Sequence, residues 1–173
     1  MNLTLDSRQP WWLQTRTLNL AGFLWCAGLM AYALYVQYAL LEEPCPLCVL
    51  QRVAVITTGV MFLLAWLHNP AGAPMRRVYG ALVLLAALAG IGIAARHIYV
   101  INAPPGAVAE CGASLDYMMD VLPLHEVLGK VLSGSGECAK VTWRLLGFSM
   151  PFWVLVNLLG LAVLGLFANW RKR

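Results

Sequence analysis

Four cysteines in this sequence are spaced so that they could carry out chemistry as two pairs. Cys45 and Cys48 form a Cys-x-x-Cys motif, and Cys111 and Cys138 follow far along the chain. Paired thiols can form disulfides, exchange them with other thiols, or bind a metal ion. A fifth cysteine, Cys26, lies alone in a long apolar run, where a cysteine is expected to pack as a small hydrophobic side chain.

Three kinds of cysteine site compete, and redox exchange fits best. A zinc or iron–sulfur site would need four converging thiolates, but Cys111 and Cys138 do not form a second Cys-x-x-Cys unit, so we predict no metal. A purely structural role is weak for Cys45 and Cys48, because so small a disulfide ring constrains little unfolded-chain entropy. A labile disulfide in the first pair could instead be reduced by the second pair through thiolate attack.

The elements that position these cysteines belong to a membrane protein. Hydrophobic residues make up 61% of the chain and charged residues 12%, a composition far too apolar for a soluble domain. Four apolar runs are long enough for helices that cross a bilayer, and they lack the alternation of barrel strands. They cover residues 19–41, 46–67, 78–100 and 148–170. We therefore predict an all-α, four-transmembrane-helix bundle that forms one domain over residues 1–173.

The charge pattern orients this bundle. Basic residues gather before the first run, between the second and third runs, and at the end of the chain, and the positive-inside rule makes these segments cytoplasmic: Arg8, Arg16, Arg76, Arg77, Arg171, Lys172 and Arg173. Loops 42–45 and 101–147, which carry the cysteine pairs, then lie on the outer side. Alternatively, the first run is a signal peptide cleaved near residues 31–33, which would leave the later loops on the same sides.

The second apolar run begins at the first cysteine pair. Pro46 suits the first turn of a helix, with Cys45 at its cap and Cys48 within the turn, where the positive helix end favours thiolate over thiol. Arg52 lies one turn further on the same face, and its charge at the membrane margin needs a partner or a function unless the side chain reaches the interface. Gln37 is explained by a hydrogen bond between helices.

The third run ends in Arg96 and His97, at the same depth as Arg52. His97 is either an interfacial side chain with a satisfied hydrogen bond or part of the site opposite the cysteine pair. The long loop that follows contains one apolar stripe at helical spacing, which predicts an amphipathic helix on the membrane surface: Leu124, Val127, Leu128, Val131 and Leu132.

Several motifs together resemble a known family. They are Pro44-Cys45-Pro46-Leu47-Cys48 with Gln51-Arg52, Arg96-His97, Cys111 with Ser114-Leu115-Asp116-Tyr117, Ser135-Gly136-Glu137-Cys138, and Leu146-Gly147-Phe148-Ser149-Met150-Pro151-Phe152-Trp153. This set is similar to the DsbB family of bacterial inner-membrane disulfide-forming proteins. The resemblance covers all four apolar runs and both outer loops.

The resemblance implies a sequence of thiol exchanges. Cys111 would form a mixed disulfide with a reduced periplasmic thioredoxin-fold protein of the DsbA type, and Cys138 would resolve it. Electrons would pass to the Cys45–Cys48 disulfide by exchange between the loops, with Cys45 and Cys138 as the reacting pair.

The resemblance also implies a membrane quinone, ubiquinone or menaquinone, as the electron acceptor. Cys48 would face it as a thiolate, with Arg52 and His97 near the quinone oxygens, and a cation there stabilises both the thiolate and the charge that develops on the quinone.

The predicted function is therefore that of a membrane thiol oxidase in the bacterial inner membrane, with both termini cytoplasmic and no nucleic-acid partner. The alternatives are a specialised paralogue that serves another thioredoxin-fold partner, and a membrane scaffold with structural disulfides.

Overall fold

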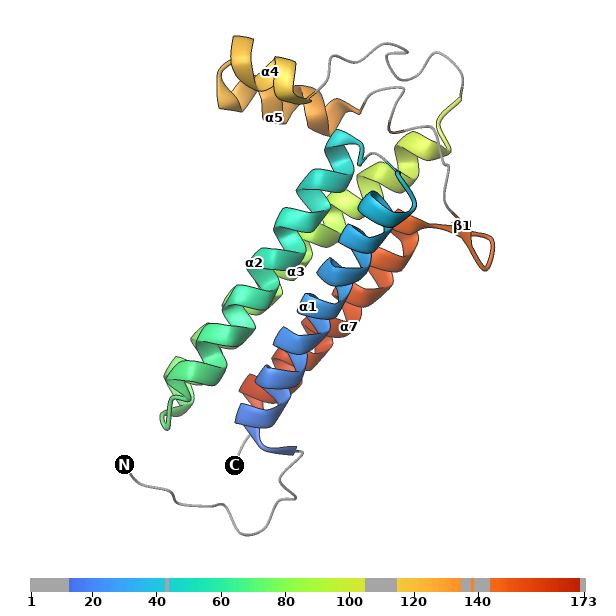
Figure 1. The fold of residues 1–173 in the computed structure, drawn as a ribbon. Coiled ribbons are helices and arrows are strands. Elements are labelled where there is room, and N and C mark those ends of the chain that lie inside the picture. The colour runs from blue at the N-terminus through green and yellow to red at the C-terminus, as the bar shows by residue number, and fades with distance from the viewer. Residues whose placement is uncertain (1–12, 43, 105–114, 135–137, 139–143, 172–173) are drawn as a thin grey trace.

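Four long helices lie side by side and form most of the molecule (Figure 1). The computed structural model describes residues 13–42, 44–104, 115–134, 138 and 144–171. The four helices are α1 (Thr15–Ala39), α2 (Pro46–His68), α3 (Ala73–Ile101) and α7 (Met150–Trp170), and each is long and apolar enough to cross a membrane. The predicted all-α, four-helix membrane bundle is confirmed.

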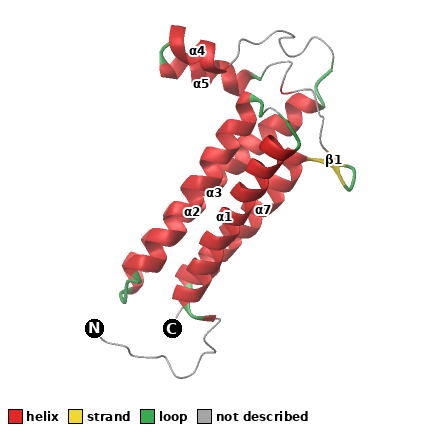
Figure 2. Cartoon of the chain, viewed as in Figure 1, coloured by secondary structure: helices red, strands yellow, loops and turns green. Residues whose placement is uncertain are grey.

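The remaining described elements are short and lie at one end of the bundle (Figure 2). Helices α4 (Leu115–Val121) and α5 (Leu124–Ser133) follow one another across this end. Strands β1 (Arg144–Leu145) and β2 (Phe148–Ser149) pair antiparallel just before α7, a hairpin that the apolar run did not indicate. Leu146 and Gly147 form its turn with positive φ values of 53° and 85°.

The helices and the apolar runs overlap but do not share their ends. Helix α3 starts at Ala73, before the apolar run begins, with a proline in its first turn. Its 29 residues span roughly 43 Å at 1.5 Å per residue, more than a hydrocarbon core of about 30 Å. A hydropathy pattern marks the part of a helix that lies in lipid, whereas the polar first turn continues beyond it.

Small residues bring the helices close together in the core. Helix α3 packs mainly against α7 and α2, and α1 packs mainly against α2. A Cβ added to Gly165 of α7 would lie 2.5 Å from Cγ1 of Val83 in α3, and one added to Gly90 would lie 2.6 Å from Cδ1 of Leu158. Without a hydrophobic effect between helices in lipid, such close packing is a main source of attraction.

A buried polar pair joins α1 to α7 far from the short elements. Nδ2 of Asn19 donates to Oδ1 of Asn169 at 3.3 Å, and Nδ2 of Asn169 donates to Oδ1 of Asn19 at 3.1 Å. Both side chains are buried, so their polar groups need partners within the protein. The pair fixes the register of the first and last helices.

Helix α5 is present where the apolar stripe predicted it. Val127 and Val131 are buried, and they pack with Leu47 of α2 and Val100 of α3 in one apolar cluster. The stripe therefore rests partly on the end of the bundle, because two spanning helices supply the apolar partner that the loop lacks. The outer residues Leu124, Leu128 and Leu132 remain exposed.

Arg96 holds the end of α5. Its Nε donates to the carbonyl oxygen of Leu132 at 2.9 Å, and its Nη2 donates to that of Ser133 at 2.8 Å. These carbonyls belong to the last turn of α5, where no helical N–H can reach them. Arg96 thus connects the third spanning helix to the loop helix.

Candidate functional site

The site begins with the first turn of α2. Cys45 is the N-cap of this helix, and its Sγ accepts a hydrogen bond from the backbone N–H of Cys48 at 3.4 Å. Pro46 occupies the first turn, where its missing N–H leaves no bond unmade. The predicted helix start is confirmed, and it holds both sulfur atoms at the positive end of the helix.

Both cysteines of this motif are thiols in the structure. Sγ of Cys45 donates to Sγ of Cys48 at 3.1 Å. Oxidation of such a neighbouring pair to a disulfide needs little movement, so the arrangement suits thiol–disulfide exchange.

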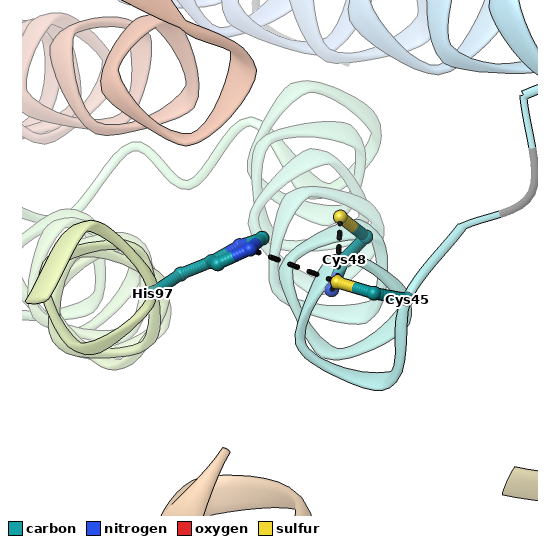
Figure 3. Close-up of side chains that lie close together, drawn as sticks. All are labelled: Cys45, Cys48 and His97. Carbon is teal, nitrogen blue, oxygen red and sulfur yellow. Dashed lines mark hydrogen bonds between the residues drawn. The ribbon is translucent and has the colours of Figure 1, made fainter. Parts of the chain in front are cut away.

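His97 reaches this pair from the neighbouring helix α3, as Figure 3 shows. Its Nε2 lies 3.7 Å from Sγ of Cys45, and the residue is almost fully buried, with 3% of its surface exposed. The same Nε2 lies 3.1 Å from the backbone carbonyl oxygen of Cys138. On the other side of the ring, Nδ1 lies 3.1 Å from Nε2 of Gln51 in α2. Both ring nitrogens therefore have protein partners.

Cys138 lies in the apolar cluster that joins α5 to the bundle. Only 2% of it is exposed, and the cluster also contains Leu47, with Cys45 packed against it. One thiol of the long loop is thus next to the first cysteine pair, through side-chain packing and through His97. The other, Cys111, lies outside the described residues.

Arg52 is held by the first helix. Its Nη1 donates to Oε1 of Gln37, and its Nη2 donates to the carbonyl oxygen of Ala33 at 3.2 Å. The hydrogen bond between helices predicted for Gln37 is confirmed, and its partner is Arg52. A guanidinium carries five N–H groups, so Arg52 has donors left for a further acceptor such as a quinone carbonyl. The donor set fits that acceptor.

Proximity alone would also allow a metal site here. The ligand atoms of Cys45, Cys48 and His97 lie within 4.8 Å of one another. Two thiolates and an imidazole are ligands that zinc accepts. Thiol–disulfide exchange also requires the two sulfur atoms to lie close together, so their proximity does not distinguish the two kinds of site. The absence of a metal stays a prediction.

The sequence patterns gave Gln51 no role, although it stands in the Gln51-Arg52 motif. It is a buried polar residue in an apolar run, three positions after Cys48, so a helix places it on the face of the cysteine pair. That combination was the available signal. The contact of His97 with the carbonyl of Cys138 had no signal in the sequence, because every residue type carries the same backbone carbonyl.

Four membrane-length helices and a thiol–imidazole cluster at one end define a multi-pass membrane protein built for thiol–disulfide chemistry. The profile of the family described as "Disulfide bond formation protein DsbB" matches residues 15–168. The chain therefore belongs to the DsbB family of membrane disulfide bond formation proteins, which implies a disulfide-forming oxidoreductase activity.

Curated relatives agree with this assignment. The chain is 47% identical to "Disulfide bond formation protein B" of Xanthomonas campestris pv. campestris (strain 8004), over 91% of this chain and 92% of the relative. It is 48% identical to the protein of that name from Chromobacterium violaceum, over 90% of this chain and 95% of the relative. It is 46% identical to the protein of that name from Methylococcus capsulatus, over 90% of this chain and 94% of the relative.

Proposed function

We propose that this protein reoxidises a periplasmic dithiol protein of the DsbA type and passes the electrons through two cysteine pairs to a membrane quinone. The observation that carries the proposal is the position of His97, which contacts both Cys45 of one pair and the carbonyl of Cys138 of the other. A purely structural pair of disulfides would not require the two pairs to meet.

In this scheme the loop pair receives the electrons first. A thiolate of the reduced partner attacks Cys111 of a Cys111–Cys138 disulfide, and Cys138 leaves as a thiolate. The partner's second thiol then attacks the partner sulfur of the mixed disulfide, which releases the oxidised partner and reduced Cys111. This step replaces the resolution by Cys138 that the resemblance implied, because attack by Cys138 on Cys111 would release the partner still reduced. The partner has lost two electrons, and the loop pair has gained them.

The electrons then cross to the first pair. The thiolate of Cys138 attacks Sγ of Cys45 in a Cys45–Cys48 disulfide, which forms a Cys45–Cys138 bond and releases Cys48 as a thiolate. Attack of Cys111 on Cys138 re-forms the loop disulfide and releases Cys45. Burial of Cys138 beside Cys45 and Leu47 supports this exchange, since it brings one loop sulfur to the first pair.

Arg52 and Cys48 are the proposed quinone-facing residues. When bound, a quinone such as ubiquinone or menaquinone supplies a two-electron acceptor. Arg52 stands one turn after Cys48 on the same helix face, where its remaining N–H groups can hold a carbonyl oxygen and its charge can stabilise the Cys48 thiolate. The earlier expectation that His97 also takes part in quinone binding stays a prediction.

The proposed location is the inner membrane, with the cysteine site on the periplasmic side. The start of α1 and the end of α7 lie at the opposite end of the bundle from α4 and α5 (Figure 1), which supports termini on one common side. The basic residues near those ends support the cytoplasm as that side.

The test is a quinone-reduction assay on detergent-purified protein with a reduced DsbA-type protein as the electron donor. Alanine at Cys45, Cys48, Cys111 or Cys138 should abolish steady-state quinone reduction. Cys26→Ala is the matched control, because Cys26 is buried in the bundle core and lies outside the scheme. Quinone reduction supported only by another thioredoxin-fold donor would indicate a specialised paralogue. If no donor supported quinone reduction, the remaining interpretation would be a membrane scaffold with structural disulfides.

A second experiment tests the order of the loop cysteines. Cys138→Ala removes the leaving thiol of the loop pair but keeps Cys111. The partner for this variant carries a single active cysteine that has been activated as a mixed disulfide with thionitrobenzoate. Attack of the Cys111 thiolate on the partner sulfur should release thionitrobenzoate and trap a Cys111 adduct visible on non-reducing gels. An adduct that needs Cys138 would reverse the assignment.

A further inference from the structure

Gln51 is a buried amide whose contact points to the histidine of the site. Only 3% of the residue is exposed, and its Nε2 lies 3.1 Å from Nδ1 of His97. A buried amide group costs free energy unless it is hydrogen-bonded, so the folded protein needs this hydrogen bond between Gln51 and His97.

The carbonyl of Cys138 decides which nitrogen of His97 carries the proton. A backbone carbonyl oxygen can only accept a hydrogen bond, so Nε2, 3.1 Å away, must be the donor. In a neutral imidazole Nδ1 is then an acceptor, and Gln51 must present its NH₂ group to it. The two contacts on opposite sides of the ring agree on one tautomer.

In this tautomer the single N–H of Nε2 is shared between the carbonyl oxygen of Cys138 and Sγ of Cys45. Nε2 of His97 lies 3.7 Å from Sγ of Cys45, within the range of hydrogen bonds to sulfur, and the backbone N–H of Cys48 approaches the same sulfur at 3.4 Å. A thiolate accepts such bonds better than a thiol does. The surroundings of Cys45 are therefore built to receive negative charge.

We propose that Gln51 is a positioning residue that fixes His97 as an Nε2–H donor to Cys45, and that this donor assists the departure of Cys45 from the Cys45–Cys138 disulfide. The proposal rests on the relay described above. In the assisted step a loop thiolate attacks Sγ of Cys138, a new loop disulfide forms, and the Cys45–Cys138 bond breaks. Both electrons of the broken bond stay on Cys45, whose thiolate accepts the hydrogen bond from Nε2.

The opposite tautomer would hinder this step. With the proton on Nδ1, the lone pair of Nε2 would face the Cys138 carbonyl oxygen and the departing Cys45 thiolate, and both would be repelled. Loss of the Gln51 amide removes one of the two groups that disfavour this state, the other being the carbonyl of Cys138. The effect belongs to the second half of the exchange, because the first attack by the partner occurs on the loop pair.

The structural test is nitrogen-15 NMR of the full-length protein in detergent micelles, with histidine labelled and the dithiol reduced. His97 should show a protonated Nε2 and an unprotonated Nδ1. Gln51→Leu should lose this preference and give a mixture of tautomers. His68, which pairs with Tyr79 outside the site, is an internal control whose signals should not change. A wild-type His97 protonated on Nδ1 alone would overturn the proposal.

Gln51→Glu is the rescue variant. Its carboxylate accepts from Nδ1–H, and because the carbonyl oxygen of Cys138 still needs a donor at Nε2, the ring is expected to hold both protons as an imidazolium. This variant should therefore show a protonated Nε2 even if Gln51→Leu does not fold. An unprotonated Nε2 in Gln51→Glu would contradict the assigned role.

The kinetic test follows the Cys45–Cys138 disulfide after mixing with the reduced partner, by rapid acid quench and peptide mapping. Gln51→Leu should slow its resolution by roughly two- to tenfold, because only the fraction of His97 that keeps the Nε2 proton still donates a hydrogen bond to the departing thiolate. Formation of this disulfide should stay close to the wild-type rate. Gln51→Glu should be slowed less than Gln51→Leu. Equal slowing of formation and resolution would refute the assignment, whereas a wild-type protein that never forms this disulfide would refute the relay itself.

Discussion

Gln37 of α1 accepts a hydrogen bond from Nη1 of Arg52 of α2, and the carbonyl oxygen of Ala33 accepts one from Nη2 at 3.2 Å. The first helix carries none of the four paired cysteines, yet it orients the one cation that follows the Cys-x-x-Cys motif on its own helix. A guanidinium fixed on one side by two acceptors presents its remaining N–H groups in a defined direction.

Arg52→Ala should raise the KM for quinone and lower quinone-dependent turnover more than the first exchange with the partner protein. Loss of a charged hydrogen bond of about 1.5–3 kcal/mol corresponds to roughly a 10- to 150-fold effect. Stopped-flow oxidation of the partner and steady-state quinone reduction separate the two steps.

Arg52→Lys is the matched variant, and it should recover only part of the activity because an ammonium lacks the planar fork. Gln37→Ala should shift the same KM by a smaller factor, about fivefold for a lost hydrogen bond of about 1 kcal/mol. Equal losses in both steps for Arg52→Ala would indicate a folding defect instead of quinone positioning.

Gly165→Ala should destabilise the bundle. The new Cβ would lie 2.5 Å from Cγ1 of Val83, so α7 and α3 would have to separate at their main contact. Overpacking of this kind costs about 1–3 kcal/mol. Unfolding of the purified protein in mixed micelles by increasing SDS measures the change.

Gly160→Ala, on the same helix, is the control for this experiment. A Cβ at Gly160 meets nothing within 4 Å, so this substitution should leave the stability unchanged or raise it slightly through helix propensity. The packing argument would be wrong if the two variants unfolded at the same SDS fraction.

The Asn19–Asn169 pair should show measurable coupling in a double-mutant cycle. Each of Asn19→Ala and Asn169→Ala breaks both hydrogen bonds of the pair, so the double variant should be little worse than either single one. A coupling free energy of about 0.6–1.7 kcal/mol is expected for polar contacts between membrane helices. Additive losses in the same SDS titration would mean that the pair does not act as a unit.

The sequence predicted the bundle well because its signal is physical and continuous. Apolar runs of membrane length leave the backbone no alternative to a helix in lipid, so α1, α2, α3 and α7 followed directly. The start of α2 followed from Pro46 beside Cys45. The exact ends of the helices could not be predicted, because hydropathy marks only the part of a helix that lies in lipid. Helix α3, for example, extends beyond its apolar segment.

The site was predictable in its residue types but not in its contacts. Cys45, Cys48, Arg52 and His97 carry their chemistry in the side chain, whereas the carbonyl of Cys138 and the amide of Gln51 gain a role only from the fold. The support of α5 by the bundle depends on Leu47 and Val100, which in the sequence are ordinary apolar residues of spanning helices.

Arg96→Ala should loosen the end of α5. It removes the donors to the carbonyls of Leu132 and Ser133, so hydrogen exchange of the amides in residues 124–134 should become faster. A lysine can make at most part of these hydrogen bonds, so the exchange rate in Arg96→Lys should fall between those of the wild type and Arg96→Ala. Exchange in the buried middle of α3 provides the reference, and an unchanged rate in α5 would show that the apolar contacts of Val127 and Val131 hold it alone.

Arg96 and His97 are consecutive residues of one spanning helix, and they bind the loop at two places, Ser133 and Cys138. The chain between those places can reach at most about 18 Å when extended. So short a tether keeps the sulfur of Cys138 at an effective local concentration in the millimolar range or above relative to Cys45. Encounter between these two thiols is then an intramolecular event, independent of how much protein the membrane holds, and only the meeting with the soluble partner depends on diffusion.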